Sequence, residues 1–97
     1  MKNRIDRIIE EATTDCYDEY EARSGWQCYL EDEIVVPQDA MVGKKPARLL
    51  RVVPICTAVH ASMQIGDLKI TVPIETVRLK NKKQNEFILA YKEWMGD

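Results

Sequence analysis

Carboxylates crowd residues 15–33, and their type and spacing suit them to chemistry better than any other group in this chain. They are Asp15, Asp18, Glu19, Glu21, Glu31, Asp32 and Glu33. Carboxylates held close together repel one another, and either a bound cation or nearby Lys and Arg side chains relieve that repulsion. Four aromatic residues are interleaved with the acids, and disordered acidic tracts are poor in aromatics, so we expect the segment to be folded.

Oxygen ligands suit hard divalent cations, and calcium accepts irregular sets of carboxylates, carbonyls and waters. The segment is not an EF-hand, because a loop counted from Asp15 places Tyr20 at the glycine position and Trp26 at the final glutamate position. Composition alone favours the plainer interpretation that the acids form a solvated surface, since most charge runs do. A metal site and a solvated face both stay open on this reasoning.

Other kinds of site find little support in the residue types. The cysteines, Cys16, Cys28 and Cys56, are odd in number and form no CxxC pair, which argues against a zinc cage or a disulfide framework. His60 is the single histidine, and without a nearby nucleophile in sequence we interpret it as structural. No nucleophile elbow, phosphate loop or dinucleotide fingerprint is present, so we expect no enzymatic activity.

Charge is distributed unevenly along the chain. Residues 1–40 carry four bases and eleven acids, a net charge of −7, whereas residues 41–97 carry ten bases and five acids, a net charge of +5. The basic half would suit phosphate groups, but it lacks the exposed, interleaved aromatics of a single-strand platform, which disfavours nucleic acid as a partner. No apolar run approaches the roughly 18 residues that span a bilayer. No signal-peptide core is present either, and we expect a cytoplasmic protein.

A helix must position the first acids of this segment. Apolar residues at spacings of three and four predict an amphipathic helix over residues 3–22. At about 100° per residue, Glu11, Asp15 and Asp18 fall on one adjoining stripe, with Glu19 on its border.

Local signals predict where helices break and end. Thr13 and Thr14 permit a break in the first helix, and Ser24-Gly25 is predicted to end it, because Gly25 suits a left-handed C-cap. The pattern does not decide whether residues 26–30 are helical or extended. A second amphipathic helix is predicted over residues 84–95.

The residues between the helices read as short strands. Runs at 34–36, 40–42, 48–53, 55–63 and 68–72 are bounded by prolines and glycines. The expected fold class is α+β, with an N-terminal helix, a small bent antiparallel sheet or SH3-like barrel of four to five strands, and a C-terminal helix. We expect one domain over residues 1–97: a helical acidic segment (3–33), a β-rich segment (34–78) and the C-terminal helix.

An ordered set of short motifs bears on the choice between a metal site and a solvated acidic face. They are D-C-Y-D-E-Y-E at 15–21, G-W at 25–26, Y-L-E-D at 29–32, V-P at 36–37 and Ala40. In this order and spacing they resemble the opening of the CcbP-type calcium-binding proteins, a small bacterial family. Residues 69–74, K-I-T-V-P-I, are similar to that family's later strand, and Glu93-Trp94 echo its tryptophan-bearing end. Residues 41–63 depart from the family's acidic character, since they are basic or neutral.

The resemblance implies a calcium-binding protein of buffer or sensor type that uses carboxylates outside any EF-hand. Carried over residue by residue, the implied metal ligands are Asp15, Asp18, Glu19, Glu21, Glu31 and Asp32. The helix would supply Asp15, Asp18 and Glu19. A turn after Trp26 would supply Glu31 and Asp32. Tyr20, Trp26 and Tyr29 are expected to pack beneath the site.

A hypothesis of another class stays open. In it the fold is an interaction module with an SH3-like barrel that binds a protein or nucleic acid, and the acidic cluster is a solvated or structural face. The expected cofactor is a calcium ion, although carboxylates also serve magnesium. We expect a monomer with no membrane contact, and the sequence leaves a protein partner open.

Overall fold

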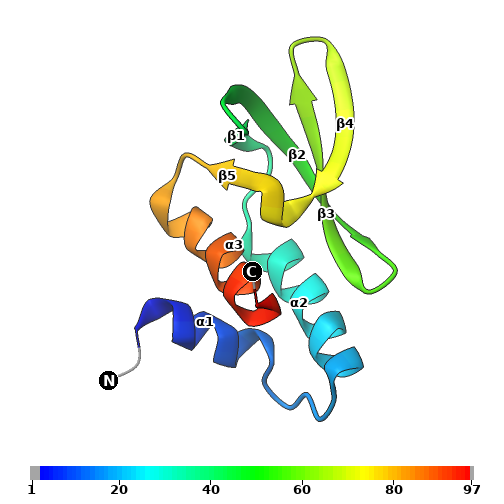
Figure 1. Ribbon diagram of the computed structural model, residues 1–97, viewed down its shortest axis with the longest axis vertical. Helices are drawn as coiled ribbons and strands as arrows, with labels where there is room; N and C mark the ends of the chain where they lie inside the picture. Colours follow the sequence, from blue (N-terminus) through cyan, green and yellow to red (C-terminus); the bar gives the residue numbers. More distant parts are fainter. Residues whose placement is uncertain (1–2, 97) are drawn as a thin grey trace.

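The computed structural model describes residues 3–96; Met1, Lys2 and Asp97, which the predicted domain includes, lie outside the described residues. In that part of the chain, the helices α2 and α3 pack against one face of a five-stranded antiparallel sheet, and a third helix, α1, packs on them (Figure 1). The helices are α1 (Arg4–Ala12), α2 (Glu19–Glu33) and α3 (Lys82–Met95). The strands are β1 (Gln38–Val42), β2 (Lys45–Ile55), β3 (Ala58–Ile65), β4 (Leu68–Pro73) and β5 (Val77–Leu79), and a 3₁₀ turn, η1 (Ile74–Thr76), precedes β5.

The strand order across the sheet is β4-β3-β2-β1-β5, and each neighbouring pair is antiparallel. The α+β class, the two terminal helices and the strand count are therefore confirmed. Of the two predicted arrangements, the sheet is the open one, because β4 and β5 form its two edges.

The first helical segment differs from the prediction. The single helix over residues 3–22 is wrong, because α1 stops at Ala12 and α2 starts at Glu19. The hydroxyls of Thr13 and Thr14 donate to the carbonyls of the preceding turn, at 2.7 Å each, and the chain leaves the helix there, at the break that the threonines permit. Asp15 then adopts a left-handed backbone conformation with φ of 60°.

The predicted stop at Ser24-Gly25 is also wrong, since both residues lie inside α2. Gly25 has a different reason for being glycine. A Cβ atom at this position would lie 2.6 Å from the backbone oxygen of Ala12 and 3.2 Å from Cys16 Sγ. The glycine lets the end of α1 approach the middle of α2.

Three strand predictions need correction, and β5 was not predicted. The strand predicted over residues 55–63 is divided, because Ile55 ends β2, a turn follows at 56–57 and β3 begins at Ala58. Residues 34–36 form no strand: Ile34 caps the C-terminus of α2 by donating its N–H to the Leu30 oxygen, and the Val35 N–H donates to Gln84 Oε1 instead of to a ladder. β2 also runs through Pro54, the predicted stop. Because β1 pairs only with the first half of β2, the proline's missing donor falls on an unpaired side of the strand.

The sheet buries one face against the helices, as the alternating pattern of β3 predicts. Val59, Ala61 and Met63 are buried there and meet the side chains of α2 and α3 in one core. Trp26 is fully buried at its centre, with its ring centroid 5.3 Å from that of Tyr91. No helix among residues 3–96 is long and apolar enough to cross a membrane.

The predicted C-terminal helix is confirmed, and it starts two residues earlier than expected. Asn81 caps it, because its Oδ1 accepts the Gln84 N–H at 3.1 Å. Gly96 ends it in the left-handed conformation.

Candidate metal centre

The loop between α1 and α2 and the first turn of α2 hold four of the predicted ligands. They are Asp15, Asp18, Glu19 and Glu21, and all four are exposed. Asp18 is the N-cap of α2, and its Oδ1 accepts the Glu21 N–H at 2.8 Å. Glu21 Oε2 in turn accepts the Tyr17 N–H at 3.1 Å. This reciprocal pair resembles a capping box, so these carboxylates order the loop whether or not they bind an ion.

Glu19 takes part in an ion pair with Arg23, one helical turn on, with 3.1 Å between Oε1 and Nη2. The pair is solvent-exposed and therefore weak, so it leaves Glu19 able to exchange partners. Asp15 lies in the loop itself. Its left-handed backbone lies in the turn between the two helices, three residues before the Asp18 cap.

The other two predicted ligands, Glu31 and Asp32, lie in the last turn of α2. The turn predicted after Trp26 is wrong, because α2 continues unbroken to Glu33. Both side chains are exposed and, within residues 3–96, have no hydrogen bond or ion pair. Three consecutive carboxylates thus stand at the negative end of the helix dipole, and the last turn holds no basic residue. That arrangement favours an added cation.

Helix α2 separates the two acidic groups. Glu19 and Glu31 are twelve residues apart in one continuous helix, which corresponds to about 18 Å at the helical rise. A single ion coordinated at about 2.4 Å cannot take ligands from both ends. The expectation of one combined ligand set is therefore wrong, although the six residues remain candidates as two groups.

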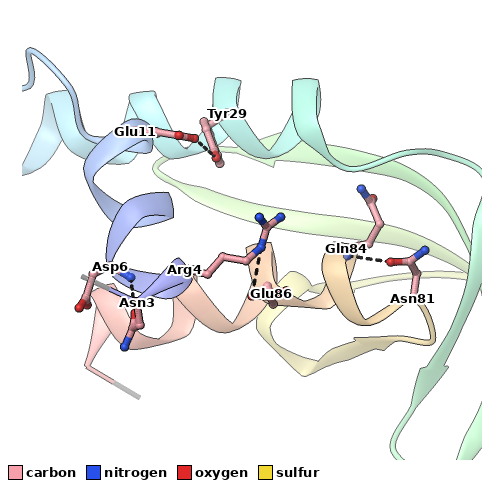
Figure 2. A network of polar contacts seen from close by, with 8 residues as sticks. All are labelled: Asn3, Arg4, Asp6, Glu11, Tyr29, Asn81, Gln84 and Glu86. Atoms are coloured by element: carbon pink, nitrogen blue, oxygen red, sulfur yellow. Dashed lines mark hydrogen bonds and ion pairs between the residues drawn. The ribbon is translucent and has the colours of Figure 1, made fainter. Parts of the chain in front are cut away.

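A polar cleft between α1, α2 and α3 lies beside the second group. It has a volume of about 500 Å³ and is lined by Arg4, Arg7, Ile8, Glu11, Tyr29, Glu33 and Phe87. The Tyr29 hydroxyl donates to Glu11 Oε2 at 2.8 Å, and Arg4 Nε pairs with Glu86 Oε2 at 3.1 Å (Figure 2). The cleft brings a carboxylate of α1 close to the end of α2.

Electrostatics in the cleft act on Tyr29. Burial, the hydrogen bond to Glu11 and the negative charges of Glu11 and Glu33 raise the pKa of this phenol well above its usual value, and the Arg4 charge opposes them. The phenol therefore stays protonated and serves as a hydrogen-bond donor. The sequence placed Glu11 on an acidic stripe, but Glu11 was not among the predicted ligands, and its contact with Tyr29 joins residues eighteen apart in the chain.

The expected packing beneath the site is only partly present. Trp26 is buried and Tyr29 half-buried, in edge contact with a centroid separation of 6.0 Å. Tyr20 is 70% exposed, so its predicted packing role is wrong. It points outward because α2 begins only at Glu19, which changes the helical phase assumed for the apolar stripe.

The carboxylates at the two ends of α2 supply oxygen atoms of the kind that calcium takes as ligands. Asp18 and Glu21 each use one carboxylate oxygen in capping, which leaves the second oxygen of each for an ion. Among the described residues, however, no three His, Cys, Asp or Glu side chains converge in an arrangement ready for a metal.

The chain is similar to one known protein family and to two solved structures. The model of the CcbP family, described as calcium binding, matches residues 6–95. The crystal structure of Anabaena CcbP superposes with a TM-score of 0.79 at 21% identity, covering 98% of this chain and 92% of that one. A structure titled as a calcium-binding protein in the calcium-binding form gives 0.76 at 20% identity, covering 97% and 90%. No curated protein matches by sequence.

Proposed function

Because the chain belongs to the CcbP calcium-binding family, we propose that it binds calcium through exposed carboxylates at the two ends of α2. The observation that carries this proposal is the family match over residues 6–95, which spans every acidic residue concerned. The fold shared with Anabaena CcbP supports the proposal, because a shared fold holds those residues on the same kind of backbone.

The first proposed site is the loop between α1 and α2, with Asp15, Asp18, Glu19 and Glu21 as ligands. Their spacing within seven residues allows carboxylates to gather around one ion once the loop closes. Asp18 and Glu21 take part in one capping arrangement, and each keeps one carboxylate oxygen free for an ion. Calcium tolerates such an irregular, partly hydrated set better than magnesium does.

The second proposed site is the last turn of α2, with Glu31 and Asp32 as ligands. Here the support is electrostatic, because adjacent carboxylates face the negative end of a helix dipole. A divalent cation would relieve both repulsions at once. Two side chains are few ligands for calcium, so water must complete the shell, and this site is the weaker of the two.

The role we infer is binding rather than catalysis, as a cytoplasmic calcium buffer or sensor that acts as a monomer. Binding that draws exposed carboxylates together rearranges the loop between α1 and α2. If the rearrangement stays in the loop, the protein acts as a buffer; if it reaches the α1–α2 contact at Gly25, it can act as a sensor.

Calorimetric titration of calcium-stripped protein tests the proposal, with magnesium as the competing ion. Asp18→Asn is the informative variant, because asparagine caps a helix as well as aspartate does but carries no charge. We expect it to weaken calcium binding while leaving the unfolding temperature unchanged in chelator. Asp32→Asn tests the second site in the same way.

Asp67→Asn is the matched control, since Asp67 is an exposed acid in the turn between β3 and β4, away from both ends of α2. It should bind calcium as the unaltered protein does. Absence of calcium binding at millimolar concentration would sink the whole proposal. Equal losses for Asp18→Asn and Asp67→Asn would show that only net charge matters, and would overturn the assignment to the loop.

A further inference from the structure

One face of the sheet carries no helix, and polar side chains line it. β3 turns Ala61 and Met63 toward the core, so Ser62 and Gln64 point to the opposite side. The helices α2 and α3 pack on the core side of the sheet, and α1 packs on these two helices (Figure 1). The opposite side is therefore open over β1 to β4.

A β-bulge brings two arginines onto that open face. Arg48 pairs in register with Gln64, and Arg51 with Ser62, although the arginines are three residues apart. Residues three apart in a regular strand point to opposite faces. The register shift at Leu50 inserts one extra residue and restores the same side for both arginines.

The neighbouring strands add to this surface. Lys69 of β4 pairs with Gln64, and Thr71 with Ser62, so two rows of donors cross β2, β3 and β4. Strands are spaced at about 4.8 Å, which puts the backbones of Arg48 and Lys69 about 10 Å apart. At the other edge, Arg78 of β5 lies beside Met41, which faces the same way as Asp39 and Arg48.

We name these bases, Arg48, Arg51, Lys69 and Arg78, the basic sheet face. All four are exposed. Asp39 is the one acid that the strands direct to this side, and it pairs with Arg48 at 3.1 Å. The other three bases have no ion-pair partner within residues 3–96. The surface therefore presents unneutralised positive charge, on the side of the sheet away from the acidic helix α2.

From this charge pattern we propose that the basic sheet face docks an acidic polypeptide segment of a partner protein. Arginine forks bind carboxylates with two parallel hydrogen bonds, and the interspersed Ser62, Gln64 and Thr71 side chains add neutral donors. No Phe, Tyr or Trp lies in any of the five strands, so His60 is the one aromatic ring on this face, and the face lacks the row of aromatic side chains on which successive bases of a single-stranded nucleic acid stack.

Fluorescence anisotropy with a labelled peptide of alternating Glu and Ser tests this docking, in low salt with chelator so that calcium plays no part. Arg51→Gln combined with Lys69→Gln should weaken peptide binding about five- to tenfold, as expected for two exposed charge pairs. Lys82→Gln combined with Lys83→Gln removes the same charge from the start of α3 and should leave binding nearly unchanged. The unfolding temperatures of both variants check that each is folded.

Three results would overturn the proposal. Equal weakening in the two double variants would mean that net charge alone attracts the peptide. Tighter binding of an oligothymidylate with the same formal charge would identify nucleic acid as the occupant. Sedimentation that shows self-association, lost in the Arg51 and Lys69 variant, would identify a second copy of this chain instead. A failure of calcium binding would leave this docking test unaffected.

Discussion

Replacing Gly25 with alanine separates helix propensity from helix packing. In an exposed helix interior, alanine stabilises by about 1 kcal/mol relative to glycine. Gly25 lies in the middle of α2, so propensity alone predicts that Gly25→Ala raises stability. The structure predicts the opposite, because the C-terminal end of α1 lies against α2 at this residue.

The size of the effect follows from the contact. The added Cβ would lie 2.6 Å from the Ala12 backbone oxygen, well inside the 3.4 Å at which ordinary contact begins. The atom it meets is backbone, and Ala12 is itself buried, so the two helices must separate. Overpacking of this kind costs about 1–3 kcal/mol. Taking the upper part of that range and subtracting the propensity gain leaves a net loss of about 1–2 kcal/mol.

Urea unfolding and a thermal melt measure this loss. A deficit of that size lowers the melting temperature of a domain this small by about 4–16 °C. Ser24→Ala is the matched control, since Ser24 is exposed on the same helix, and alanine there should stabilise by about 0.5 kcal/mol. If Gly25→Ala proved more stable than the unaltered protein, the close α1–α2 approach would be refuted.

Other predictions test the cleft, the cap and the core. Tyr29 has a raised pKa in the folded state, so above pH 10 the folded chain holds a proton that the unfolded chain has lost; stability should fall as pH rises past about 10, and less steeply in Tyr29→Phe. Identical pH profiles would contradict the cleft's electrostatics. Asn81→Ala should cost about 1 kcal/mol in urea unfolding, and Asn81→Ser much less; equal costs would argue against a capping role. Met63→Ala should cost about 2–5 kcal/mol in the same assay, whereas a cost below that range would mean that the core face of β3 is misassigned.

The parts of the fold that the sequence predicted are those with strong local patterns. The alternation from Val59 to Met63 and the periodicity of α3, with Gly96 after it, follow local sequence patterns and are present in the structure, although β3 begins at Ala58 and α3 at Lys82. The signal for α2 was also present, because Ala22, Trp26 and Leu30 recur every four residues and all are buried. It was obscured by the glycine inside the helix.

Gly25 shows why local sequence patterns could not predict the other parts of the fold. A glycine after an amphipathic run has the same local appearance whether it ends a helix or admits a neighbouring one, and only the position of α1 distinguishes the two. The bulge at Leu50 is similar, since two successive leucines do not reveal which strand carries the extra residue.

The candidate site was also predicted only in part. The sequence identified the acidic residues by type, and the family resemblance identified calcium. It could not show that Glu19 and Glu31 stand at opposite ends of one helix, because that distance depends on the helix continuing through Gly25. Likewise, Glu11 and Tyr29 meet across eighteen residues of sequence, and no local pattern predicts that contact.

The melting temperature of calcium-stripped protein, measured with added calcium or added magnesium, tests calcium binding most directly. An ion that binds only the folded state must stabilise it, by about 2.7 kcal/mol at a hundred times its dissociation constant. We predict a rise in melting temperature with calcium that exceeds the rise with magnesium and is reduced in Asp18→Asn. An unchanged melting temperature at millimolar calcium would contradict the proposed function.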